Sequence, residues 1–167
     1  CTLLLPFGSP AHQINLFTAL SAAAAVGVLG GLLHRRGLHP AVALGASLAF
    51  AFSCTFWSQA VIAEVYGMAI LGAVLLFWAG AATAEDRGEG AWLGLAYLAG
   101  LGLTLHLSLV LLWPGSALLV WRRRPELWRD GGALGRAVAG FVLGFSPVIY
   151  LFIRNGKGPA FHWGTIS

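Results

Sequence analysis

Long apolar stretches separated by short polar connections run through nearly the whole chain. Six can be marked, the fourth and fifth sharing one run: Ile14–Leu33, Ala41–Cys54 (extendable to Trp57), Val65–Ala82, the shared run Ala91–Trp121, and Ala133–Ile153. About 20 apolar residues are enough to cross the hydrocarbon core of a bilayer as a helix. The pattern predicts an all-α, polytopic helical membrane protein with about six transmembrane or half-length helices. We expect one membrane-embedded domain over residues 1–167.

Composition also points to a membrane protein. Hydrophobic residues make up 58% of the 167 residues and charged residues only 10%, whereas soluble domains contain about 25% charged residues. Most of the basic residues lie in two connections, at Arg35–Arg36 and Arg122–Arg129. A nucleic-acid-binding surface needs basic residues spread along one face. We therefore expect the lipid bilayer as a partner, and no nucleic acid.

The run Ala91–Trp121 is too long for one straight span. It would measure about 46 Å as a helix, against about 30 Å for the hydrocarbon core. Basic residues favour the cytoplasmic side, which places Arg35–Arg36 there. Arg122–Arg124 reach the same side only if the run crosses twice. We therefore expect a bend near Leu105–Ser108, with His106 near the outer face.

Glu64 is the only acid between Cys1 and Ala84, and it lies between two apolar stretches. An ionisable residue at membrane depth is a functional-site hypothesis by default. Glu64 could act as a base, a metal ligand or the partner of a cation. It could equally be an acid at a helix N-terminus, where the helix dipole contributes about 0.3–1 kcal/mol.

Two further polar residues fall on the same predicted side. His106 lies inside an apolar run, where a histidine needs a partner. The alternative to a functional role is a packing hydrogen bond worth about 0.6 kcal/mol. Arg154 directly follows the last apolar stretch. It fits either an interfacial anchor or a bidentate ligand of a phosphate. The histidines and cysteines show no metal-ligand spacing.

Two pairs of glycines have the spacing that lets helices approach closely. They are Gly27 with Gly31 and Gly140 with Gly144. Small residues four apart form a narrow stripe on one helix face. We interpret both pairs as ordinary helix packing rather than as a dimerisation motif.

The segment Thr55–Tyr66, with its Phe-Trp-Ser-Gln and Glu-Val-Tyr groups, resembles the signature of the domain-of-unknown-function 2723 family. That family includes eukaryotic transmembrane O-mannosyltransferases that modify plexin-type domains. Four other segments agree with the family pattern in order: Pro6–Leu20, Gly102–Ser108 with Pro114, Tyr150–Arg154 and Pro159–Gly164. In the last segment His162 stands where the family usually has Asn.

The resemblance implies a fold similar to the GT-C glycosyltransferases. These multi-span enzymes take a sugar from a polyprenyl-phosphate donor at the outer membrane face. A general base deprotonates the acceptor hydroxyl, and cationic groups or a divalent metal stabilise the leaving phosphate. The resemblance thus implies a protein or glycan acceptor and no definite cofactor. It places the protein in a bacterial inner membrane or its equivalent, with the site on the extracytoplasmic face.

The resemblance also assigns roles to individual residues. Glu64 and His106 are implied as supporting catalytic residues, because the family's principal acid lies in an outer loop that would precede Cys1. Substrate-binding roles fall on five residues: Trp57, Gln59, Tyr66, Arg154 and Trp163. We therefore expect a fragment that lacks the N-terminal span and first outer loop, and that is inactive alone.

Two other functions compete with this hypothesis. A transporter or flippase subunit would place Glu64 and His106 along a polar path, and short broken helices occur in transporters too. A non-catalytic, truncated membrane protein is the third alternative.

Overall fold

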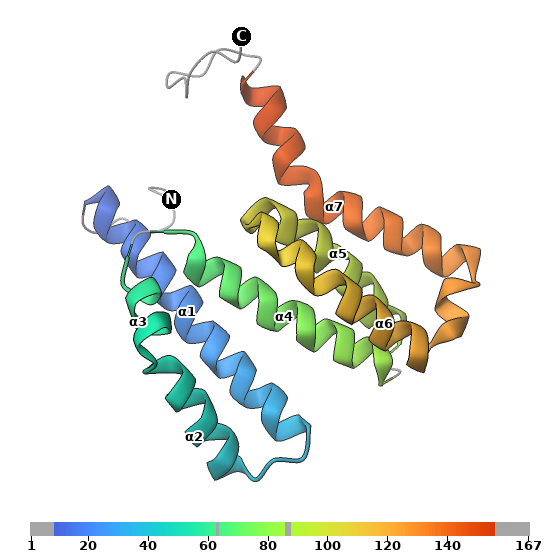
Figure 1. Cartoon of the computed structure of the whole chain (residues 1–167). Coiled ribbons are helices and arrows are strands. Elements are labelled where there is room, and N and C mark those ends of the chain that lie inside the picture. The colour runs from blue at the N-terminus through green and yellow to red at the C-terminus, as the bar shows by residue number, and fades with distance from the viewer. Residues whose placement is uncertain (1–8, 63, 86–87, 156–167) are drawn as a thin grey trace.

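The computed structural model describes residues 9–62, 64–85 and 88–155, and in these residues the chain is helical without a strand (Figure 1). The all-α prediction is confirmed. The helices follow one another as α1 (Pro10–Arg35), α2 (Pro40–Ala51), α3 (Cys54–Ala60), α4 (Tyr66–Ala84), α5 (Glu89–Leu105), the 3-10 helix η1 (Leu107–Leu112), α6 (Trp113–Arg123), the 3-10 helix η2 (Pro125–Trp128) and α7 (Gly131–Asn155).

The sequence suggests about six transmembrane or half-length helices, and three or four of the described helices can span a membrane. Among the described residues, α1, α4 and α7 are long and apolar enough, and α2 with α3 makes a fourth if the bent pair is one span. The 17 residues of α5 measure about 26 Å and the 11 residues of α6 about 17 Å. Both lengths fall short of the roughly 30 Å hydrocarbon core.

Local sequence signals set the boundaries of the first three helices. The Ser9 hydroxyl accepts a hydrogen bond of 3.3 Å from the His12 N–H and caps the start of α1. Gly37 has φ of +91° in the turn after α1, a conformation that favours glycine. The chain bends by 68° between α2 and α3. Ser53 lies at that bend, and its hydroxyl accepts from the Phe56 N–H at 3.4 Å.

The basic connections lie at one end of the bundle, where ion pairs link them to neighbouring helices. We call this end the arginine end. Arg36 after α1 lies 3.8 Å from Glu85 after α4. Arg136 in α7 lies 3.0 Å from Glu89, the first residue of α5. The last turn of α6 also lies at this end (Figure 1). The α3–α4 connection and the break between α5 and η1 therefore lie at the opposite end.

Helices α5 and α7 approach so closely that glycine is required at their contact. A Cβ atom added to Gly100 would overlap the backbone of Phe141, and one added to Gly144 would overlap the backbone of Tyr97. The predicted packing role of the Gly140–Gly144 spacing is thus confirmed within the chain. A Cβ atom at Gly27 would meet nothing within 4 Å, so that glycine makes no such contact in the described residues.

A cluster of buried apolar side chains lies between α4, α5, α6 and the start of α7. Its buried members are Leu76, Trp92, Leu95, Val120, Ala133 and Ala137. The Trp92 indole N–H donates to the Ala133 carbonyl at 2.9 Å and ties α5 to α7. Beyond this cluster α7 contains Pro147, and its C-terminal part leans away from the other helices (Figure 1). Phe152 there is 72% exposed, as expected for a side chain that faces lipid.

Candidate functional site

A pocket of about 320 Å³ opens at the end opposite the arginine end. It lies where α3, the first half of α4 and the break between α5 and η1 meet. Its polar lining comes from Gln59, Tyr66, His106 and Ser108, and its apolar lining from Ala69, Ile70, Ala73, Leu109 and Leu112. The structure therefore brings three of the predicted site residues, Gln59, Tyr66 and His106, around one cavity.

His106 occupies the break between α5 and η1. Its backbone is extended, with φ of −162° and ψ of 129°, so the helix ends at Leu105. Only the backbone N–H of His106 continues the helical pattern, donating to the Gly102 carbonyl at 2.9 Å. The bend predicted near Leu105–Ser108 is thus present. It turns the chain back toward the arginine end through η1 and α6.

The hydrogen bonds of His106 define which ring nitrogen carries the proton. The Ser108 backbone N–H donates to Nδ1 at 3.2 Å, and the Ser108 hydroxyl lies 2.7 Å from the same nitrogen. A backbone N–H can only donate, so Nδ1 acts as the acceptor. In a neutral imidazole the other nitrogen is then the donor. His106 therefore has its Nε2–H as the donor that remains for a ligand.

Tyr66 and Gln59 complete the polar side of the pocket. The Tyr66 ring lies with its centroid 5.7 Å from that of His106, at an interplanar angle of 41°. Tyr66 is the first residue of α4, and the next residue, Gly67, lies directly against Thr18 of α1. Gln59 has a buried Oε1 with no hydrogen-bond partner among the described residues. A ligand that donates a hydrogen bond there would satisfy it.

Glu64 lies in the connection between α3 and α4, and its side chain is exposed. Its backbone carbonyl accepts a hydrogen bond of 3.1 Å from the Thr18 hydroxyl. The described lining of the pocket does not include Glu64. Trp57 on α3 is 53% exposed and stacks on Phe52 with ring centroids 5.6 Å apart. The structure thus places both residues beside the pocket-forming segments without bringing them into its lining.

Arg154, another predicted substrate-binding residue, lies away from this pocket. Arg154 is exposed in the last turn of α7, where its guanidinium donates to the Tyr150 hydroxyl at 3.0 Å. That part of α7 leans away from α3, α4 and α5 (Figure 1). The described lining of the pocket does not include Arg154. Trp163 lies outside the described residues.

The residues that the structure describes contain no ready set of metal ligands. Among them, no three or more His, Cys, Asp or Glu side chains are grouped to hold an ion. The expectation of a divalent metal therefore stays a prediction, and no chemical step is derived through one. The pocket itself offers one ring N–H, one phenol, one amide and one hydroxyl above an apolar floor. Such a surface can orient a hydroxyl-rich or phosphate-bearing ligand.

Ser108 is the site residue that the sequence interpretation missed. The only available signal was its position two residues after His106. Serine at that spacing suits a local side-chain hydrogen bond in a turn. The bend predicted near Leu105–Ser108 makes this signal usable, because in a continuous helix residues two apart do not face each other.

Comparison with known proteins identifies a family and a curated relative. Residues 1–129 match the family described as protein O-mannosyl-transferase TMEM260 N-terminal domain. Protein O-mannosyl-transferase TMEM260 of Mus musculus is 29% identical over 174 residues. That alignment covers 96% of this chain and 24% of the mouse protein, so the chain spans about a quarter of the length of this relative. No solved structure matches the chain significantly.

Proposed function

Because the chain belongs to the family of TMEM260 protein O-mannosyl-transferase N-terminal domains, we propose that it forms part of a multi-pass membrane glycosyltransferase. The donor is a polyprenyl-phosphate sugar, and mannose is the sugar that the relative's name suggests. The acceptor is a hydroxyl group of a protein or glycan. The proposal includes a fold similar to that of the GT-C glycosyltransferases.

The observation that carries the proposal is the convergence of Gln59, Tyr66 and His106 on one pocket. Gln59 and Tyr66 come from the segment Thr55–Tyr66, and His106 comes from Gly102–Ser108. Both segments bear the family resemblance, although they lie far apart in the sequence. The pocket combines an apolar floor with a few polar groups, which is the usual character of a small-ligand site. Its volume of about 320 Å³ is at the lower end of the range for such sites.

In the proposed reaction an acceptor oxygen attacks the anomeric carbon of the donor sugar. The new carbon–oxygen bond forms as the bond from that carbon to the phosphate oxygen breaks, and the phosphate leaves with the electron pair. The acceptor proton passes to a general base. We assign that base to a group outside the described residues, with the exposed Glu64 carboxylate in support.

The pocket residues act on the donor. The Nε2–H of His106 donates a hydrogen bond to a phosphate oxygen as negative charge develops there. The Gln59 amide binds sugar hydroxyls, and the Tyr66 ring lies against the sugar. Trp57, Arg154 and Trp163 are proposed to bind substrate when the remaining parts of the enzyme are in place.

The proposed site faces the extracytoplasmic side of the membrane. The support is the clustering of basic residues at the arginine end, because basic connections favour the cytoplasm. The pocket lies at the opposite end, on the α3–α4 side of the bundle. A bacterial inner membrane or its equivalent is the proposed location.

The test is sugar transfer by the full-length protein in proteoliposomes that contain polyprenyl-phosphate mannose. We expect His106→Gln to lower kcat by about 10²–10³-fold, the usual cost of removing one transition-state donor. His34→Gln is the matched control, since His34 bonds the Leu38 carbonyl at 3.1 Å near the arginine end. Equal activity of both variants and the unaltered protein would remove His106 from the site.

The 68° bend between α2 and α3 favours a second candidate, a transporter or flippase subunit. Broken helices line substrate paths in many transporters. The same proteoliposomes separate the two functions. Movement of the lipid-linked sugar between leaflets without transfer to an acceptor would support transport and contradict the transferase.

A further inference from the structure

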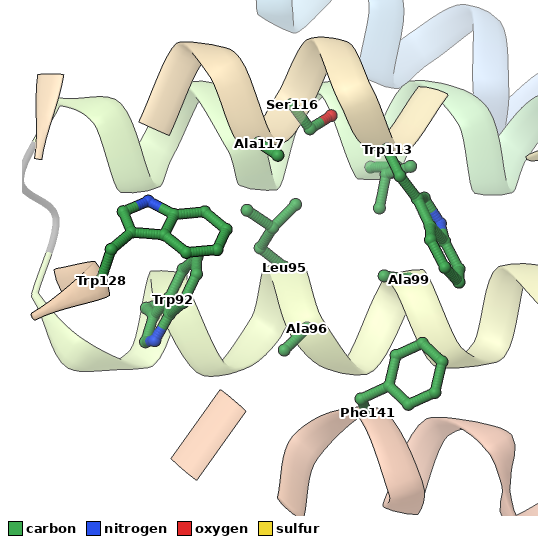
Figure 2. A pocket seen from close by; sticks show the side chains of 10 residues that line it. Trp92, Leu95, Ala96, Ala99, Trp113, Ser116, Ala117, Trp128 and Phe141 are labelled. Atoms are coloured by element: carbon green, nitrogen blue, oxygen red, sulfur yellow. The ribbon is translucent and has the colours of Figure 1, made fainter. Parts of the chain in front are cut away.

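A second pocket, of about 230 Å³, lies between α5 and α6 toward the arginine end (Figure 2). Aromatic side chains stand at both of its ends. Trp92 and Trp128 contact each other edge-on with centroids 5.5 Å apart, and Trp113 and Phe141 do the same at 5.5 Å. Figure 2 shows the first pair at one end of the pocket and the second pair at the other.

The shape of the pocket follows from the residues between the two aromatic pairs. Between the aromatic pairs the pocket is lined by Leu95 and by small side chains, among them Ala99 and Ala117 (Figure 2). Protein interiors contain few voids larger than a water molecule. A void with apolar walls does not hold water and accepts apolar ligands instead. The pocket is thus suited to a hydrocarbon group.

The volume narrows the choice of ligand. Pockets that enclose a whole small molecule measure about 300–1,000 Å³, and this one is smaller. It therefore fits part of a single hydrocarbon chain better than a compact molecule. Trp128 is 40% exposed, so the end of the pocket nearest η2 is the more open one. A chain that enters there leaves its head group beside the residues that flank η2.

Those flanking residues are basic. Arg122 and Arg123 form the last turn of α6, and Arg129 follows Trp128 directly; all three are exposed. In the described residues none of the three forms an ion pair. Arg124 differs, because its hydrogen bond to Glu126 occupies it and lowers the pKa of the Glu126 carboxyl. Three exposed cationic side chains therefore flank η2 in the sequence, next to the end of the pocket that Trp128 lines.

We propose that this pocket binds an anionic phospholipid of the bilayer. One acyl chain occupies the space between α5 and α6, and the phosphate lies against Arg122, Arg123 and Arg129. Guanidinium groups bind phosphate through paired, charge-assisted hydrogen bonds. Basic pockets between membrane helices are a known means of holding anionic lipid head groups. The proposal is independent of the sugar-transfer site, which lies at the other end of the bundle.

The test measures phospholipid retained by the full-length protein after reconstitution and detergent extraction. The vesicles contain equal amounts of phosphatidylglycerol and phosphatidylcholine, and native mass spectrometry counts the lipids that stay bound. Each arginine near an anionic head group raises affinity about fivefold. The double variant Arg122→Gln with Arg123→Gln should therefore weaken phosphatidylglycerol binding roughly thirtyfold.

The matched control is Arg35→Gln with Arg36→Gln, which removes two positive charges at the same end of the bundle. Arg35 lies over the Trp78 ring and Arg36 pairs with Glu85, so neither belongs to the pocket. We expect this control to change binding less than threefold. Equal loss in both double variants would overturn the proposal, because it would show a general effect of surface charge.

A second pair of variants tests the acyl chain. Ala117→Phe places a ring in the pocket and should displace bound phosphatidylglycerol, whereas Ala49→Phe on the exposed face of α2 should not. The proposal would also be overturned if the unaltered protein retained phosphatidylglycerol and phosphatidylcholine in equal amounts, or retained neither lipid. The arginine substitutions are on exposed side chains, so they test binding even if Ala117→Phe fails to fold.

Discussion

Tyr66 at the start of α4 and His106 at the end of α5 lie with ring centroids 5.7 Å apart. The two residues belong to different apolar stretches, and both line the proposed donor pocket. Their contact depends on two local events: α4 begins at Tyr66, and α5 ends one residue before His106. The site therefore forms where two helices terminate side by side.

Loss of the Tyr66 ring should weaken donor binding. An aromatic contact contributes about 0.5–1.5 kcal/mol beyond its buried area, so we expect Tyr66→Ala to raise the donor KM about tenfold. Tyr66→Phe keeps the ring and should raise it less than threefold. Steady-state transfer assays over a range of donor concentrations give both values. If Tyr66→Phe and Tyr66→Ala raise the donor KM equally, the hydroxyl of Tyr66 rather than its ring is the important group.

Removal of the Ser108 hydroxyl should loosen the His106 ring. A neutral hydrogen bond contributes about 0.5–1.5 kcal/mol, which predicts a loss of kcat of up to about tenfold in Ser108→Ala. The backbone N–H of Ser108 remains and still donates to Nδ1. Nitrogen NMR of labelled histidine should therefore show an unprotonated Nδ1 in both proteins. A protonated Nδ1 in the unaltered protein would contradict the assigned role of Nε2–H.

A side chain at Gly144 should destabilise the α5–α7 contact. A Cβ atom there would overlap the Tyr97 backbone, and overpacking of this kind costs about 1–3 kcal/mol. We expect Gly144→Ala to lower the midpoint of thermal unfolding in detergent. Gly27→Ala is the matched control, because its Cβ would meet nothing within 4 Å. That change should leave the midpoint unchanged or raise it, since alanine favours helix over glycine.

Trp92→Phe should also lower stability, by removing one buried hydrogen bond. The indole N–H donates to the Ala133 carbonyl at 2.9 Å, and phenylalanine leaves that carbonyl without its donor. The expected loss is about 1 kcal/mol. Trp121→Phe serves as the comparison, because Trp121 is 65% exposed. Equal unfolding midpoints for the two variants would show that the bond contributes nothing.

The position of the break at His106 could be predicted from the sequence, whereas the residues around the resulting pocket could not. Helix length and the distribution of arginines limit how the run Ala91–Trp121 can cross a bilayer, and those signals are local. Tyr66 lies on another stretch and Gln59 lies between two stretches, so their approach to His106 depends on how the helices pack. The exposed positions of Glu64 and Arg154 depend on that packing as well.

By itself, the sequence determined the helical membrane class, the bend near Leu105–Ser108, and the separation of basic and polar connections. These properties follow from apolar length and from the distribution of charge along the chain. The tertiary structure decided that α5 and α7 touch through Gly100 and Gly144, and that α5 and α6 stay apart around a pocket. Such contacts depend on the shapes of two helix faces at once, and no single stretch of sequence contains that information.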